Sequence, residues 1–405
     1  MTSLNTWRAH RVLSLVGMTA LTLALTACGG GGGGGSTSGS NGTGGTPSSG
    51  TTSSNGAALL AAYTPPADIA ADLVPSSSAP AFDVGNSNMA SNCQVTSKLS
   101  PNVIVTPDAI VYGAGASTKA MELAADLFEN QALPQVRTAL GLPTTGVAFG
   151  GGKVQICVDT ALGVSDSETG TSLTGQTVLG GSGPVIQMVS ADSSNFDSRY
   201  PGATSYTSPV GTSYATLFVH EGTHAALFSL SEPFGALPTF VQEGLAQLVA
   251  QQPAGTKSSV LAAVKSTDIL AVSNVNSDMN LYPTYLATMD YLTSSAPGGL
   301  GFGLTNVKTL LATYVTDATT ACAAAIPSGT IPPASQLQGM PAGEYNTCVV
   351  GAGAIDARLN TAFDLAFSQS FKNADGSPLY LHTGEDPGGN ALEQTLVARL
   401  SAFLQ

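Results

Sequence analysis

The sequence predicts an α+β protein whose strands lie mainly in the first half of the chain and whose helices lie mainly in the second. Short apolar runs rich in β-branched residues, bounded by Pro or Gly, occur before residue 190. From about residue 212 onward, apolar residues recur at the three- and four-residue spacing of amphipathic helices. Because the two patterns are separated along the chain, they favour segregated elements over a repeating β–α–β alternation.

The first 27 residues predict an export signal. Arg8 and Arg11 provide a positive start, and residues 12–27 form an uncharged apolar run that ends in small residues. This run is shorter than the roughly twenty residues that a membrane span needs. Residues 25–28, L-T-A-C, resemble the lipobox of bacterial lipoproteins. The alternative is an ordinary secretory signal with a coincidental Cys.

The lipobox resemblance implies cleavage before Cys28 and lipidation of that residue, which would anchor the protein to a lipid bilayer. Gly29 after the Cys, rather than Asp, indicates sorting to the outer membrane of the bacterial cell envelope. Residues 28–56 are rich in Gly, Ser and Thr, cannot form a core, and predict a flexible tether.

Residues 57–405 remain for the folded part, as one large domain or as a core with an appendage. We divide it into a β-rich part over 93–211, a pair of helices over 212–252 and a helical part over 253–405.

Four Cys remain after Cys28, and an even number in an exported chain predicts two disulfides with three possible pairings. We favour Cys93–Cys157 and Cys322–Cys348, since each closes a loop within one half of the chain. No C-x-x-C spacing occurs, so none is expected to bind metal.

The charge composition argues against a nucleic-acid partner. The formal net charge is −13, only 10% of residues are charged, and Lys and Arg form no cluster. Binding to phosphate needs such a basic patch.

The first half contains the candidate strands, at 103–105, 110–112, within 147–159 and within 183–190. A helical pattern covers 118–140, where Pro134 marks a break or a new start. Residues 200–211 are rich in Ser, Thr and Pro and predict a loop.

Two helices follow. The first covers about 214–228, capped by Thr212 or Ser213, and the second covers about 239–250, before Pro253. Thr239 and Gln242 have the spacing of a capping box. Further helical patterns cover about 258–270, 282–294, 304–315, 354–370 and 389–404.

Residues 220–224, H-E-G-T-H, are the most informative segment of the chain. On a helix, His220 and His224 stand one turn apart on one face, where two imidazoles can bind one Zn²⁺. Glu221 is then placed beside the metal, as a general base acting on zinc-bound water. The chain has only four His, so a chance occurrence of this pattern is improbable.

A catalytic zinc needs a third protein ligand. No third His follows before His382 and no Asp before Asp268, which leaves Glu232 and Glu243 nearby. Glu232 precedes Pro233 in a turn, where a solvated acid is expected. Glu243 lies among apolar neighbours in the second helix, where a carboxylate needs a partner, and we expect it to be the third ligand.

The pair of motifs, H-E-x-x-H at 220–224 and E-G-x-A at 243–246, resembles the gluzincin metallopeptidases. The resemblance covers roughly residues 183–300. It implies a zincin-like fold with one Zn²⁺ held by His220, His224 and Glu243, and Glu221 as the base. It also implies that the strand at 185–189 is the sheet edge beside the active-site helix, where a peptide substrate could add as a strand.

The chain departs from this family in one position. Thermolysin-like members carry an Asp four residues after the ligand Glu to orient a His ligand, and here that position is Gln247. An amide can accept from the imidazole but supplies no charge. The residue that stabilises the transition state is expected to be Tyr285, with Tyr282 and His382 as alternatives.

These features predict a zinc metalloendopeptidase that is lipid-anchored at the cell envelope and hydrolyses a peptide or protein substrate. Two alternatives stay open. One is an envelope binding lipoprotein on a gluzincin scaffold with little or no catalysis, and the other is a structural lipoprotein without metal. The sequence does not reveal the substrate.

Overall fold

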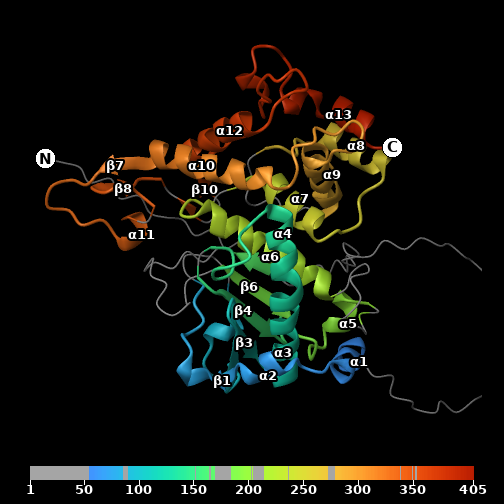
Figure 1. The fold of residues 1–405 in the computed structure, drawn as a ribbon, viewed down its shortest axis with the longest axis vertical. Coiled ribbons are helices and arrows are strands. Elements are labelled where there is room, and N and C mark those ends of the chain that lie inside the picture. The colour runs from blue at the N-terminus through green and yellow to red at the C-terminus, as the bar shows by residue number, and fades with distance from the viewer. Residues whose placement is uncertain are drawn as a thin grey trace, which may run out of the picture.

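The computed structural model describes residues 54–84, 90–150, 152–163, 166–168, 184–201, 203, 214–235, 237–271, 279–337, 339–348, 350–351 and 354–405 (Figure 1). The predicted signal peptide, Cys28, most of the tether, most of the 200–211 loop and the helix cap at 212–213 lie outside these residues. None of the described helices is both long enough and apolar enough to cross a bilayer.

The described residues form a mixed α+β fold, as predicted. Figure 1 shows the large sheet and its covering helices in the lower half of the view and the C-terminal helices above them. The six-stranded sheet has the order β1-β2-β3-β4-β6-β5. Its strands are β1 (Leu73–Pro75), β2 (Asn102–Val105), β3 (Ala109–Ala114), β4 (Val154–Asp159), β5 (Asp166–Glu168) and β6 (Val185–Val189).

All four predicted strands are present, but the predicted sheet edge is wrong. Strand β6 does not lie at the edge, because β5 pairs antiparallel to it, with Asp166 opposite Gln187 and Glu168 opposite Val185. Every residue of β6 is buried, as expected for a strand with neighbours on both sides. The short polar segment 166–168 carries no strand pattern, so the sequence could not reveal this edge. Strand β5, rather than β6, is the edge strand beside α6 (Tyr214–Ser231).

One β–α–β unit departs from the predicted segregation of elements. Strands β3 and β4 are parallel, and the segment 118–140 crosses over between them as α3 (Thr118–Asp126), the π-helical turn η3 (Leu127–Ala132) and α4 (Leu133–Leu140). Pro134 lies in the first turn of α4, so it marks the new start that was one of two possibilities. Gly141, at φ +64°, ends the helix in the left-handed conformation.

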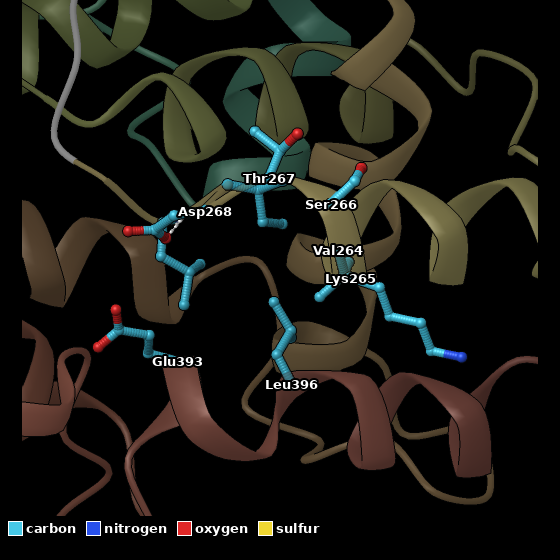
Figure 2. Close-up of a pocket in the computed structure, with 9 residues that line it drawn as sticks. Val264, Lys265, Ser266, Thr267, Asp268, Glu393 and Leu396 are labelled. Carbon is cyan, nitrogen blue, oxygen red and sulfur yellow. Dashed lines mark hydrogen bonds between the residues drawn. The ribbon is translucent and has the colours of Figure 1, made fainter.

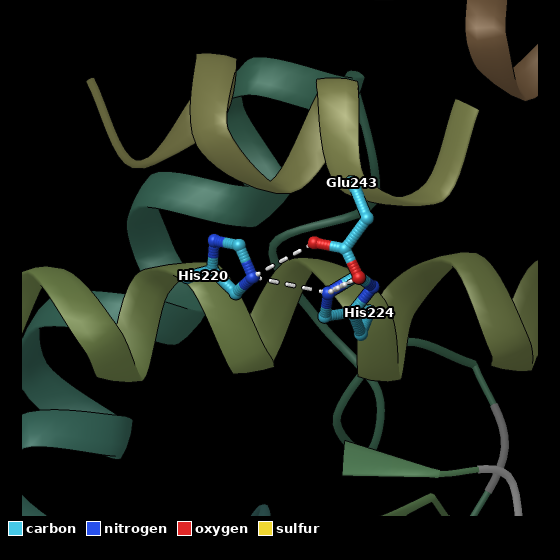
Figure 3. Close-up of side chains that lie close together, drawn as sticks. All are labelled: His220, His224 and Glu243. Carbon is cyan, nitrogen blue, oxygen red and sulfur yellow. Dashed lines mark hydrogen bonds and ion pairs between the residues drawn. The ribbon is translucent and has the colours of Figure 1, made fainter. Parts of the chain in front are cut away.

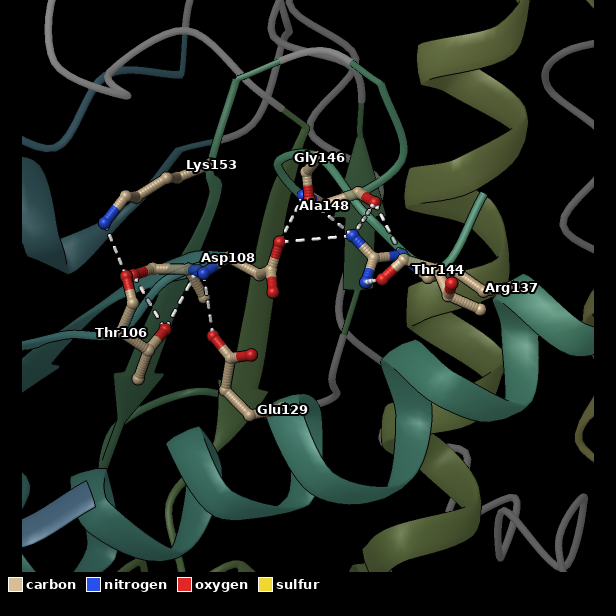
Figure 4. Close-up of polar contacts among 9 residues, drawn as sticks. Thr106, Asp108, Glu129, Arg137, Thr144, Gly146, Ala148 and Lys153 are labelled. Atoms are coloured by element: carbon tan, nitrogen blue, oxygen red, sulfur yellow. Dashed lines mark hydrogen bonds and ion pairs between the residues drawn. The ribbon is translucent and has the colours of Figure 1, made fainter. Parts of the chain in front are cut away.

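A buried polar network fixes this crossover to the sheet (Figure 4). The guanidinium of Arg137 on α4 lies 3.2 Å from the Asp108 carboxylate, in the turn between β2 and β3. It also donates to the carbonyls of Gly146 and Ala148, at 2.8 and 2.7 Å. Glu129 in η3 accepts from the backbone N–H of Asp108 at 2.9 Å. Five donors in a planar fork let one arginine tie the helix, the turn and the following loop together.

The predicted helices of the second half are present, but the one expected over 304–315 continues to Cys322 and the one expected over 258–270 ends at Ser266. They are α6, α7 (Thr239–Val249), α8 (Lys257–Ser266), α9 (Tyr282–Thr293), α10 (Asn306–Cys322), α12 (Ala357–Ser370) and α13 (Leu392–Phe403). Short elements are α1 (Asn55–Ala62), α2 (Ala67–Ala71), α5 (Phe196–Arg199), α11 (Ala334–Leu337), the two-stranded sheets β7–β8 (Ala323–Ala325, Glu344–Asn346) and β9–β10 (Val350–Gly351, Ala354–Ile355), and the turns η1 (Ser76–Ser78), η2 (Asn92–Gln94), η4 (Met279–Leu281) and η5 (Thr383–Glu385).

The predicted capping box of α7 is wrong. Pro238 is the N-cap residue and Thr239 is the first residue inside the helix. The Gln242 side chain instead donates to the carbonyl of Leu237 at 2.6 Å. A Pro at the boundary with ψ 141° already directs the chain into the helix, so the start lies one residue earlier than the motif suggested.

The favoured disulfide pairing is the one that the structure contains. Cys93–Cys157 joins η2 to the central strand β4, and Cys322–Cys348 joins the end of α10 to the segment after β8. Their Cα–Cα distances are 6.0 and 5.2 Å, which lie in the usual range.

Gly244 allows α7 and α9 to pack closely. A Cβ at Gly244 would lie 2.5 Å from the Tyr285 carbonyl oxygen and 2.6 Å from Met289 Cγ. A backbone oxygen cannot move without shifting its helix, so this contact requires Gly. By contrast, a Cβ at Gly222 on α6 would meet the Ala132 and Val136 side chains at 3.6 and 3.8 Å, ordinary van der Waals distances.

We therefore expect Gly244→Ala to lower the free energy of unfolding by about 1–3 kcal/mol, because the added methyl forces α9 away from α7. Gly222→Ala is the matched control. It should leave stability unchanged or raise it by up to about 1 kcal/mol, since Ala favours the helix over Gly. Urea unfolding of the metal-free protein measures both, and equal stability of the two variants would contradict this account of Gly244.

Candidate metal centre

Helix α6 buries two imidazoles side by side. The helix packs against α4, η3, α7 and α10 and against the sheet. Most of its residues are therefore buried, whichever face of the helix they occupy. His220 and His224 are only 7% and 6% exposed, and their Nε2 atoms lie 3.1 Å apart. The predicted helix therefore places both side chains on one face, in a setting where buried polar groups need partners.

Glu243 brings a carboxylate to the same point from α7. Figure 3 shows its side chain reaching from α7 toward the two imidazoles of α6. Its Oε2 lies 3.5 Å from His220 Nε2, and its Oε1 lies 3.6 Å from His224 Nε2. Oε2 is buried and accepts no hydrogen bond from the described residues.

The electrostatics of this group favour the ionised carboxylate. Burial alone would raise the pKa of Glu243, but the charge of His224 and the polar contacts with both imidazoles outweigh it. They hold the pKa of Glu243 well below its ordinary value. A carboxylate that stays charged in the interior attracts a cation.

The three side chains fit a metal ion. Each offers one ligand atom, and among the described residues this is the group of His, Cys, Asp or Glu that could hold a metal. In a tetrahedral zinc site the ligand atoms are about 3.3–3.4 Å apart, as follows from the usual Zn–N and Zn–O distances. The observed separations of 3.1, 3.5 and 3.6 Å lie close to that value.

Comparisons with known proteins do not assign the chain to a family. The chain matches no protein-family model and no curated protein sequence.

Glu221, the predicted base, is the residue after His220 on α6 and is 5% exposed. Helical geometry places it about 100° around the axis from His220, which is beside the ligand pair rather than in line with it. The next two residues fit the helix into its surroundings: Gly222 faces η3 and α4, and the Thr223 hydroxyl donates to the Val219 carbonyl at 2.8 Å.

Glu232, the alternative third ligand, is not part of the metal-binding group. It follows the end of α6 and is half-buried, whereas the sequence suggested a solvated acid. Burial raises the pKa of Glu232 to about 7.

The three candidate transition-state residues lie in two places. Tyr285 and Tyr282 are on α9, with ring centroids 6.2 Å apart, and Tyr285 is 1% exposed. His382 lies elsewhere, with its ring 3.7 Å from Asp364 and 3.9 Å from Glu393. Burial and the neighbouring Glu385 raise the pKa of Asp364 to about 7.

A cavity of about 290 Å³ lies between the end of α8 and α13 (Figure 2). Glu393 lines it, together with the segment from Val264 to Leu270 and Leu396. His220, His224 and Glu243 do not line this cavity, and His382 is not part of their group.

Gln247, the residue at the position that orients a His ligand in thermolysin-like proteins, bonds to backbone carbonyls instead. The Gln247 amide donates to the carbonyls of Tyr282 and Glu243, at 2.9 and 3.2 Å, and so ties α7 to α9. Gln252, just beyond the helix, has its Oε1 3.1 Å from His220 Nδ1. No motif signals Gln252, because its position depends on how the chain turns after α7.

We expect Glu243→Gln to abolish stoichiometric zinc binding and Glu232→Gln to preserve it, as measured by metal analysis after dialysis. An amide is a poor zinc ligand. At a zinc concentration 100 times the wild-type Kd, the Glu243 variant should also lack about 2.7 kcal/mol of stabilisation. Glu232→Gln should cost no stability at pH 8, because it replaces an acid whose charged form is disfavoured by burial. The opposite assignment, with zinc lost only in the Glu232 variant, would exclude Glu243 as a ligand.

Proposed function

We propose that this protein is a zinc-dependent metalloendopeptidase of the gluzincin type, anchored by lipid at the bacterial cell envelope. The observation that supports it most is the convergence of Glu243 from α7 on the H-E-x-x-H pair of α6. Two separate motifs, 19 positions apart between His224 and Glu243 in the sequence, meet at one point. If the two histidines were incidental residues of a structural helix, nothing would explain why the Glu243 carboxylate lies next to both of them.

A zinc ion held by these residues would polarise a peptide carbonyl and acidify water, since three protein ligands leave one coordination position open. Glu221 would take the proton from water as the water oxygen bonds to the carbonyl carbon. The same carboxylate would then deliver that proton to the amide nitrogen as the C–N bond breaks. Hydrolysis would thus leave Glu221 ionised for the next cycle.

Tyr285 remains the proposed residue that stabilises the developing negative charge on the carbonyl oxygen. Its helix, α9, packs directly on α7 beside the ligand Glu243. Tyr285 is 1% exposed, less than His220 or His224. The phenol O–H of a tyrosine can donate a hydrogen bond to such an oxygen.

A peptide or protein substrate would reach this site from outside the cell membrane, given the predicted export signal and the two disulfides. The edge strand β5 lies beside α6 and is the position at which an extended peptide could pair with the sheet.

We expect Glu221→Gln to retain one zinc per chain and the wild-type melting temperature while losing about 10²- to 10⁴-fold in hydrolysis of an unfolded protein substrate. The amide preserves shape but has no basic lone pair to accept the proton. A variant with activity within a few-fold of wild type would show that Glu221 is not the base. Zinc binding without any hydrolysis by the wild-type protein would instead support the binding lipoprotein.

The anchor has its own test. Cys28→Ser should move the protein from the membrane fraction to the soluble fraction, because serine has no thiol to carry the acyl chains that would anchor the protein. Circular dichroism and zinc content should not change, since residues 28–53 precede the first described helix. Unchanged membrane association would exclude lipidation at Cys28.

A further inference from the structure

We propose that Gln252 is a positioning residue that fixes the tautomer and ring orientation of His220 for metal binding. The inference rests on the proposed metal site, and it assigns a role to a side chain that lies outside both sequence motifs.

The contact with Gln252 favours one of the two neutral tautomers of His220. Gln252 Oε1 lies 3.1 Å from His220 Nδ1, and a carbonyl oxygen can only accept. The contact therefore favours the tautomer in which Nδ1 carries the proton and donates to Gln252, and in the neutral ring this leaves the lone pair on Nε2. That lone pair is on the side of the ring that faces His224 Nε2 and Glu243 Oε2, at 3.1 and 3.5 Å. Gln252 thus holds His220 in the form that a metal ligand requires.

A specific turn brings Gln252 back toward α6. The N–H of Gln252 donates to the Gln247 carbonyl at 2.9 Å, and the N–H of Gln251 donates to the Leu248 carbonyl at 3.1 Å. These two bonds form a Schellman motif, which reverses the chain at the end of α7. The turn residue Gln251 has φ +54°, a left-handed conformation that usually selects Gly. The chain accepts this strained conformation at the position next to the residue that contacts His220.

Helix α7 consequently holds His220 from both sides of its ring. Glu243, in its first half, approaches Nε2, and Gln252, beyond its end, contacts Nδ1. The end of the helix is fixed from two other directions. Gln135 on α4 donates to the Val249 carbonyl at 2.8 Å, and Gln247 donates to the Tyr282 carbonyl of α9 at 2.9 Å. Because these bonds fix the turn, Gln252 acts as a rigid rather than a mobile acceptor.

The test compares Gln252→Leu, which removes the acceptor, with Gln252→Glu, which keeps one and adds charge. Gln251→Ala is the matched control, because it leaves the left-handed turn in place and alters an exposed side chain that no bond joins to His220. The dissociation constant for Zn²⁺ is measured by competition with a chelating dye at fixed pH. The ring tautomer of His220 is measured in the metal-free protein by long-range proton–nitrogen NMR, with His220→Asn identifying the signal.

We expect Gln252→Leu to weaken zinc binding by about 10- to 100-fold and to lose the pure Nδ1–H tautomer of His220. Gln252→Glu should restore the tautomer and bind zinc at least as tightly as wild type, because a carboxylate is the stronger acceptor. Gln251→Ala should match wild type in both measurements.

Two results would overturn the assignment. One is an unchanged tautomer and affinity in Gln252→Leu, and the other is an equal loss in Gln251→Ala, which would mean that the turn alone matters. If the wild-type protein takes up no zinc, the proposed function fails, and the tautomer of His220 in the Leu and Glu variants still decides the role of Gln252.

Discussion

The structure depends on one electrostatic constraint: three lone-pair donors meet in its interior. Two imidazoles at 3.1 Å and a carboxylate at about the same distance from both lose their hydration when the helices close around them. Such a group is stable only with positive charge among its members. A proton can supply this charge in part, and a divalent cation can supply it fully. Binding of a cation by this group would therefore favour the packing of α7 over α6.

The rest of the fold brings these donors together and keeps them fixed. The Arg137–Asp108 network holds α4 to the sheet, and α4 with η3 forms one wall against α6. On the other side, close packing at Gly244 fixes α7 to α9. Glu243, which could bind a metal ion, and Gly244, which permits the close packing, are adjacent in α7. The packing of α7 against α9 therefore also fixes the position of the Glu243 backbone. This adjacency explains in physical terms why a Glu-Gly pair occurs at this point of the helix.

The sequence allowed prediction of what depends on local pattern. The H-E-x-x-H spacing predicted two imidazoles on one face, and the apolar neighbours of Glu243 correctly distinguished it from Glu232 as the acid that joins them. The four strand positions and both disulfide pairings followed from composition and spacing.

What could not be predicted depends on three-dimensional approach. Strand β5 is a polar segment that becomes a strand only because β6 pairs with it. Gln252 reaches His220 only because Gln251 adopts a conformation that its residue type rarely takes. In the same way, Gln247 has the spacing of a ligand-orienting residue, but the closeness of α9 diverts its amide to a backbone carbonyl. Each error arises where a tertiary contact overrides a local rule.

The short edges of the sheet have a consequence for how two copies of the protein can meet. Both of its outermost strands, β1 and β5, are only three residues long, and β1 ends in Pro75, which has no N–H to offer. Long unpaired edges are templates on which identical chains add to one another and aggregate. A three-residue edge offers room for a few hydrogen bonds to one extended segment but is too short to join the sheets of neighbouring copies into one.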